Sequence, residues 1–223
     1  MNALVLRAPG TNCEEETSWA LGLAGMPAEI VPLARALADP GLVASARFVA
    51  IPGGFSFRDE GGPGRRFGEA LSGPRLGPAL RAMVRRGGML LGICNGFQAL
   101  VAAGWFGDGL RFAPNGSGRF ECRWVRVRSD APALLPIAHG EGRLVASPDT
   151  VARLEREGRV ILRYVDNPDG SAGDIAGLSD STGRVIGIMP HPERAVTLDQ
   201  VPGRAGGEPA GLRLLRAIIS GTT

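Results

Sequence analysis

The stretch GMLLGICNG (residues 88–96) joins a fully apolar run to a turn that holds one cysteine between two glycines. A short apolar run of this kind, bounded by glycines, predicts a buried strand. Apolar residues at helical spacing follow directly, from residue 95 to residue 103. The sequence therefore predicts a strand, a sharp turn and a helix, with the cysteine at the turn.

The same alternation of strands and helices runs through the first half of the chain. The pattern predicts strands at residues 3–8, 28–33, 47–54 and 88–93, and helices at 14–24, 76–86 and 95–103. After residue 118 the hydropathy pattern changes. Residues 119–128 alternate polar and apolar side chains, which is typical of an antiparallel strand with one exposed face. The later elements are strands at 160–165, 174–179 and 185–189, and helices at 148–157 and 209–219.

This order of elements predicts an α/β protein. We expect a three-layer, open, flavodoxin-like sheet that is mostly parallel, with some antiparallel strands in the second half. No clear linker or internal repeat divides the sequence, so residues 1–223 are expected to form a single domain. A chain of 223 residues, 44% of them hydrophobic, can bury a full core without metal or disulfide support.

Composition also limits the possible locations and partners. No apolar run reaches the roughly 18 residues of a membrane span, and residues 1–10 lack the features of a secretory signal. Three widely spaced cysteines argue against a disulfide framework and favour a reducing cytoplasm. The net charge is +3, and all 25 basic residues are arginines interspersed with acids, which predicts no nucleic-acid surface.

Cys94 is the candidate nucleophile. The pattern G-x-C-x-G is the cysteine counterpart of the nucleophile elbow, in which the reactive side chain sits on a strained turn between a strand and a helix. A helix N-terminus also favours the thiolate over the thiol. The alternative is a buried structural cysteine. Cys13, which precedes three glutamates, and Cys122, which lies within a predicted strand, are expected to take no part.

A thiolate enzyme needs a base, and the chain has two histidines. His191 lies between Pro190 and Pro192, which fix the local backbone. Glu193 would point to the same side as His191 in an extended segment and could hold the second ring nitrogen. His139, in the stretch HGEG, is the rival base, although its glycine neighbours are more typical of a loop that lines a site.

Acyl transfer also needs hydrogen-bond donors for the tetrahedral oxyanion. The stretch PGGFS (52–56) ends the third predicted strand, and Cys94 follows the fourth. The carboxyl ends of parallel strands meet at one edge of a sheet, where ligands bind. We therefore predict that the backbone N–H groups of Gly54 and Asn95 form the oxyanion hole.

The motifs GICNGFQ (92–98) and PHPER (190–194) together resemble the class I glutamine amidotransferases, whose triad is Cys, His and Glu. Within that family the chain most resembles the glutaminase subunits of phosphoribosylformylglycinamidine synthase. This narrower resemblance rests on the stretches PGTNC (9–13), PGGFS (52–56), NGSGRFEC (115–122), HGEG (139–142) and NPDGS (167–171).

The resemblance implies a reaction and a set of roles. Cys94 would attack the side-chain amide of glutamine while His191 protonates the departing ammonia, and water would then hydrolyse the glutamyl thioester. Gln98 would help to bind glutamine, and Phe55 and His139 are further candidate contacts.

The resemblance also implies partners. A separate synthetase subunit would use ATP and Mg²⁺ to convert formylglycinamide ribonucleotide into formylglycinamidine ribonucleotide, in purine biosynthesis. A small third subunit would bridge the two. This chain is expected to bind no cofactor or metal, and it has no G-x-x-x-x-G-K-[ST] motif for ATP phosphates.

One segment departs from the family pattern. Arg58 stands where the family usually has glycine, and it fits only if that position does not need a positive φ. Residues 58–75 are predicted to form one long loop, with Arg65 and Arg66 as a candidate docking surface. Two other readings remain open: a different cysteine hydrolase of similar α/β architecture, and a binding module without catalysis.

Overall fold

One mixed sheet organises the molecule. The structure is a computed structural model that describes residues 3–129, 132–203 and 206–222. Among these described residues, nine strands pair in one sheet in the order β2-β1-β3-β4-β11-β10-β9-β6-β7. The parallel strands are β1 (Ala3–Arg7), β2 (Ala28–Pro32), β3 (Phe48–Ile51), β4 (Met89–Ile93) and β11 (Val185–Ile188). The antiparallel strands are β6 (Glu121–Arg128), β7 (Pro132–His139), β9 (Val160–Tyr164) and β10 (Ile175–Ser179).

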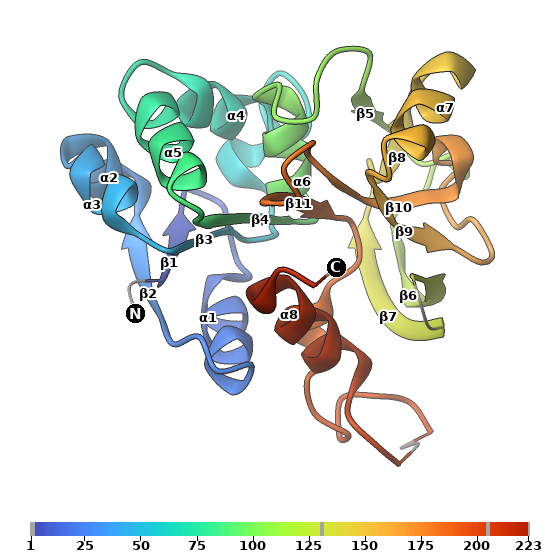
Figure 1. Cartoon of the computed structure of the whole chain (residues 1–223). Helices are drawn as coiled ribbons and strands as arrows, with labels where there is room; N and C mark the ends of the chain where they lie inside the picture. Colours follow the sequence, from blue (N-terminus) through green and yellow to red (C-terminus); the bar gives the residue numbers. More distant parts are fainter. Residues whose placement is uncertain (1–2, 130–131, 204–205, 223) are drawn as a thin grey trace.

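Helices cover both faces of the parallel half (Figure 1). One face carries α2 (Leu33–Ala38), α3 (Pro40–Ser45), α4 (Arg65–Ser72), α5 (Leu76–Arg85) and α6 (Asn95–Ala102). The other face carries α1 (Glu14–Leu23) and α8 (Ala210–Ser220). Near the antiparallel half of the sheet lie α7 (Pro148–Arg156) and a two-stranded sheet of β5 (Arg111–Ala113) and β8 (Arg143–Val145). The predicted fold class is confirmed: a three-layer, mostly parallel sheet with antiparallel strands in the second half.

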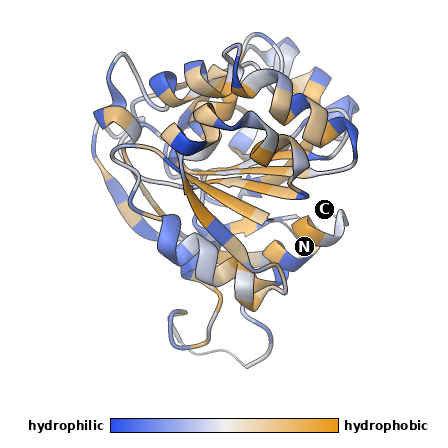
Figure 2. Ribbon diagram, turned by 90° about the vertical axis from the view of Figure 1, so that its left-hand side faces the viewer, coloured by the Kyte–Doolittle hydropathy of each residue, from blue (hydrophilic) through white to orange (hydrophobic). Residues whose placement is uncertain are grey.

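The core lies between these layers. The central strands are orange in Figure 2, whereas hydrophilic residues lie on the outer surfaces of the helices. Every residue of β3, β4 and β11 is buried. Among the described residues, no helix is long and apolar enough to cross a membrane.

Several elements differ from the prediction, since α2, α3, β5 and β8 were not predicted. The strand β7 was not predicted, because Pro132 and Pro136 interrupt its sequence. It lies at the edge of the sheet, where a strand tolerates proline because one side makes no ladder bonds. The prediction of one long loop over residues 58–75 was wrong: α4 forms within it and buries Phe67 and Leu71.

The segment before α4 is strained. Phe57, Arg58 and Asp59 all have positive φ, of 53°, 58° and 51°. Arg58 was expected to fit only if its position did not need a positive φ, and the structure contradicts that expectation. Each residue other than glycine in the left-handed region costs roughly 1–2 kcal/mol. The Asp59 carboxylate holds the turn, because it accepts hydrogen bonds from the Gly64 amide (3.3 Å) and the Asn95 side chain (2.9 Å).

Gly96 allows α6 to pack closely against β3. A Cβ atom there would lie 2.0 Å from the carbonyl oxygen of Ile51, which is fixed in β3. We predict that Gly96→Ala lowers the free energy of unfolding by about 1–3 kcal/mol or more, measured by urea denaturation. The matched control is Gly22→Ala, at an exposed position in α1 with nothing within 4 Å, which should stabilise by about 0.4–1 kcal/mol. Equal effects of the two substitutions would contradict this account.

Candidate active site

Cys94 occupies the turn between β4 and α6. Its φ of 51° and ψ of −109° lie outside the usual regions for a residue with a side chain. The turn is held from both sides, because the Cys94 amide donates to Ile188 and its carbonyl accepts from Gln98. A Cβ at Gly92 would lie 2.6 Å from the Gly96 carbonyl oxygen, so the turn needs that glycine. This is the strained geometry of a nucleophile elbow, as predicted.

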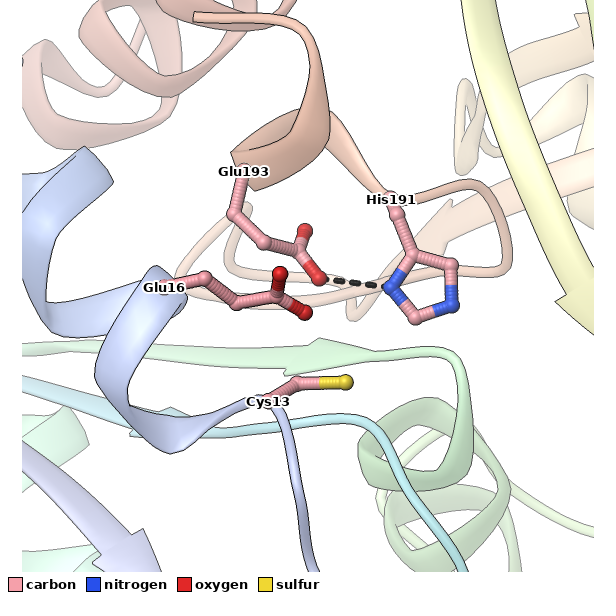
Figure 3. Close-up of side chains that lie close together, drawn as sticks. All are labelled: Cys13, Glu16, His191 and Glu193. Carbon is pink, nitrogen blue, oxygen red and sulfur yellow. Dashed lines mark hydrogen bonds and ion pairs between the residues drawn. The ribbon is translucent and has the colours of Figure 1, made fainter.

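His191 and Glu193 follow the neighbouring strand β11. The His191 Nδ1 lies 2.5 Å from the Glu193 Oε1, and both side chains are buried (Figure 3). The segment is not extended as expected, since Pro192–Arg194 forms a single 3₁₀ turn. The turn still directs the carboxylate back toward the imidazole. Because β11 pairs in parallel with β4, His191 and Cys94 come to the same edge of the sheet.

Three side chains meet over Gly53. A Cβ at Gly53 would lie 2.8 Å from the His191 Cε1, 3.1 Å from the Cys13 Sγ and 3.5 Å from the Cys94 Cβ. Only a residue without a side chain leaves this space open. The sequence-predicted triad residues are therefore brought together.

The charges around His191 favour the protonated form of its imidazole. Burial acts to lower the pKa of His191, but the negative charges of Glu193 and Cys94 and hydrogen bonds to the two thiols outweigh it. The net pKa of His191 is raised well above its usual value. An imidazolium beside a thiolate at a helix N-terminus is the arrangement that activates a cysteine nucleophile.

Cys13, which was expected to take no part, also lies at this site beside His191. Its thiol is 3.1 Å from the Asn12 Oδ1 and 3.2 Å from the Arg194 Nη2. Burial raises the pKa of Cys13 to about 11, with His191 and Arg194 opposing the change, so Cys13 stays a thiol at neutral pH. Cys13 follows β1, and its place at the carboxyl end of a parallel strand is the signal that could have revealed it.

The same cluster offers potential metal ligands. One atom each of Cys13, Glu16, His191 and Glu193 lies within 4.8 Å of the others (Figure 3). Arg194 already occupies this cluster, because its guanidinium lies 2.8 Å from the Glu16 carboxylate and 3.2 Å from the Cys13 sulfur. A cation would have to displace that positive charge, so the residues fit an ion pair better than a metal.

The predicted oxyanion donors flank the elbow. Asn95 is the first residue of α6, where the backbone N–H has no intrahelical partner. The Asn95 side chain accepts from the Ser56 amide (3.1 Å), which ties the helix to the loop that holds Gly54. Gly54 has a φ of 129°, and a Cβ there would lie 2.7 Å from the Asn12 nitrogen. The role of the two amides stays a prediction.

Gln98 and Phe55 have different surroundings. The Gln98 amide is engaged within the protein, since it donates to the Glu141 carbonyl and accepts from Asn95, both at 2.9 Å. Phe55 is 48% exposed, and its ring lies 6.5 Å from that of Phe120. Contact of either residue with glutamine stays a prediction.

His139 is buried at the end of β7. Its Nδ1 lies 3.1 Å from the Asn115 Oδ1, and its Nε2 lies 3.7 Å from the Asp169 Oδ2. Burial and the charge of His191 lower the pKa of His139 to about 4. Between the two candidate bases, this geometry favours His191, which has a carboxylate at 2.5 Å and the thiols beside it.

Two further carboxyl groups near the site were not assigned from the sequence. Burial raises the pKa of Asp59 and of Glu141, and the charge of Asp59 raises that of Glu141 further. Of the stretches that hold them, only HGEG (139–142) was singled out, for its resemblance to the family and for His139. Their proximity arises from folding and has no signal in sequence spacing.

Comparison with known proteins gives one family. Residues 1–214 match the family of CobB/CobQ-like glutamine amidotransferase domains. A relative from Rubrobacter xylanophilus, named phosphoribosylformylglycinamidine synthase subunit PurQ, is 43% identical over 236 residues that cover 99% of each chain. A relative of the same name from Dehalococcoides mccartyi is 39% identical over 226 residues, which cover 91% of this chain and 88% of the other.

Solved structures agree with this grouping. A chain in the structure of PurLQS from Thermotoga maritima has a TM-score of 0.79 and 31% identity, and the match covers 98% of this chain and 97% of the other. A chain described as a glutamine amidotransferase, also from Thermotoga maritima, has a TM-score of 0.54 at 14% identity, covering 90% of this chain and 80% of the other. The second match shows a shared fold only.

The buried imidazole of His139 predicts an acid-sensitive stability. In the unfolded chain a histidine takes up its proton near pH 6.5, whereas folded His139 does so near pH 4. Between these values the unfolded state binds more protons, so stability falls as the pH is lowered, by up to about 3 kcal/mol. His191 does not contribute in this window, because its folded pKa is raised above 6.5.

We therefore predict that His139→Gln flattens the loss of stability between pH 6.5 and pH 4. The measurement is urea unfolding at a series of pH values, with the two proteins compared at each. Parallel stability profiles for the original and substituted proteins would contradict the prediction.

Proposed function

We propose, from the premise that this chain belongs to the family of CobB/CobQ-like glutamine amidotransferase domains, that it is the glutaminase subunit of a phosphoribosylformylglycinamidine synthase. The observation that carries the proposal is the meeting of Cys94, His191 and Glu193 at one edge of the sheet. The names of the relatives support the choice of branch, because they match over nearly the full length of both chains.

The geometry supports a thioester mechanism. The Cys94 thiolate adds to the side-chain amide carbon of glutamine, and the N–H groups of Gly54 and Asn95 bind the oxyanion that forms. The His191 imidazolium gives its proton to the amide nitrogen, so that the C–N bond breaks and ammonia leaves. His191 then takes a proton from water, which attacks the thioester, releases glutamate and restores the thiolate. Glu193 holds the ring in position throughout.

Substrate contacts and partners form the finer part of the proposal. Phe55, Gln98 and His139 line the glutamine site. Ammonia passes to a synthetase subunit that uses ATP and Mg²⁺, and a small third subunit bridges the two, while this chain binds no cofactor. The chain acts as one domain over residues 1–223, in the cytoplasm, without nucleic acid or membrane as a partner.

The docking surface on α4 remains a prediction. Arg65 and Arg66 are exposed at the start of the helix, and they pair with Glu69 (3.2 Å) and Glu60 (2.8 Å). Exposed pairs of this kind are worth at most about 1 kcal/mol, so the partner can exchange them at little cost.

Replacing the nucleophile should separate the two half-reactions. In the complex with the synthetase, Cys94→Ala should abolish product formation from glutamine and leave product formation from added ammonium salt unchanged. Cys122→Ser is the matched control, since Cys122 is free and exposed, and it should leave both activities intact. Loss of both activities in Cys94→Ala would mean that Cys94 serves assembly. Retained glutamine use would mean that it is not the nucleophile.

Replacing the orienting carboxylate should alter the pH dependence. Glu193→Gln removes the charge that raises the pKa of His191. We predict a loss of about 10²- to 10⁴-fold in glutamine-dependent kcat, and a shift of the alkaline limb of kcat/KM to lower pH. Steady-state glutamate release across a pH series measures both. A normal pH profile in this variant would show that Glu193 does not act through His191.

A further inference from the structure

A second group of buried polar side chains lies next to the triad. His139, Tyr164 and Asp169 are exposed by only 3%, 1% and 1%. Within the part of the chain that the structure describes, the His139 Nε2, the Tyr164 hydroxyl and the Asp169 Oδ2 have no hydrogen-bond partner. Buried polar atoms without partners are rare and cost about 1–3 kcal/mol each. Three such atoms on neighbouring residues are available to bind one small polar molecule.

Asn115 fixes the hydrogen on the His139 ring. The Asn115 Nδ2 donates to the carbonyls of Arg119 and His139, both at 2.8 Å. The Asn115 Oδ1 accepts from the Gly142 amide at 2.9 Å, and it also faces the His139 Nδ1 at 3.1 Å. The Nδ1 must therefore carry the hydrogen. Because burial lowers the pKa of His139 to about 4, the ring is neutral and its Nε2 is a hydrogen-bond acceptor.

Asp169 supplies a second acceptor opposite the ring. Its Oδ1 is satisfied by the Ser171 amide (2.9 Å) and hydroxyl (2.7 Å). Its Oδ2 lies 3.7 Å from the His139 Nε2, which is too far for a direct hydrogen bond. The His139 Nε2 and the Asp169 Oδ2 both accept hydrogen bonds, so a ligand that bridges them must supply at least two hydrogens. The Tyr164 hydroxyl, which lies close enough to Asp169 to affect the pKa of that carboxyl, is the donor of the cluster.

The cluster lies next to the Cys94 thiol. The Cys94 Sγ lies 3.8 Å from the carbonyl oxygen of Ala138, the residue before His139. Burial and the charges of Asp169 and Cys94 all raise the pKa of the Tyr164 hydroxyl well above its usual value. The residues come from the stretches HGEG and NPDGS and the strand β9, none of which contributes to the triad.

We propose that His139, Tyr164 and Asp169 form a buried binding site for the ammonia released at Cys94. The inference rests on the proposed function, which supplies the ammonia. Ammonia has three N–H donors and one lone pair, so it can donate to the His139 Nε2 and the Asp169 Oδ2 and accept from the Tyr164 hydroxyl. A neutral His139 cannot protonate it, so the bound molecule stays ammonia and is not converted to ammonium by this ring. The site holds ammonia away from solvent before it passes on.

The test is the coupling ratio of the complete complex. We compare formylglycinamidine ribonucleotide formed with glutamate released, at saturating glutamine, for Tyr164→Phe and Asp169→Asn. The ratio should fall at least about threefold in each variant, as expected for loss of one hydrogen bond, because ammonia escapes. Product formation from added ammonium salt reports that the synthetase and the assembly are intact. Ser179→Ala, which removes a buried hydroxyl from the adjacent strand β10, is the matched control and should keep the original ratio.

The outcomes separate this proposal from the proposed function. Tyr164→Phe keeps the aromatic ring and its packing. If the ratio of formylglycinamidine ribonucleotide to glutamate is unchanged in this variant, the ammonia site is overturned and the cluster is a site for water only. Tyr164→Phe decides the question even if Asp169→Asn fails to fold. Absence of glutamate release from the unsubstituted complex would overturn the proposed function and this site with it.

Discussion

The parallel pairing of β4 with β11 is the constraint on which the site depends. Its register sets Ile93 beside Ile188, so the chain leaves both strands at the same edge and places Cys94 and His191 together. The packing of α6 against this pair requires glycine at position 187, because a Cβ there would lie 2.0 Å from the Phe97 ring. It also anchors the elbow directly, through the hydrogen bond from the Cys94 amide to Ile188. A distortion of this pair would separate the thiol from the imidazole.

The site combines backbone strain with buried charge, and packing opposes both costs. Cys94, Phe57, Arg58 and Asp59 all hold positive φ without being glycine. Asn95 joins the two strained segments, since its side chain bonds to Asp59, to Ser56 and to Gln98. The charges of Glu193 and His191 are stabilised by each other at 2.5 Å in place of water. Strain of this kind is stored where a reactive group must be held in one geometry.

Sequence patterns predicted the features that depend on residues close together in the sequence. The apolar runs located the parallel strands, and the motifs around Cys94 and His191 named the residues that the structure brings together. Patterns failed where the determining contact is distant in sequence. The strand β7 forms despite its prolines because β6 pairs with it, and Cys13 enters the site because β1 ends beside β3. The bonds of Asn115 to His139 likewise have no signal in spacing, since they exist only after the loops meet.

The central claim is that Cys94, and not Cys13, is the reactive thiol beside His191. A glutamine-mimicking electrophile tests it directly: the protein is treated with the reagent, with and without excess glutamine, and the modified peptide is identified by mass spectrometry. The account predicts that Cys94 is modified and that glutamine protects it, while Cys13, whose pKa is raised to about 11, stays unmodified. Modification of Cys13 in place of Cys94, or labelling that glutamine does not block, would contradict it.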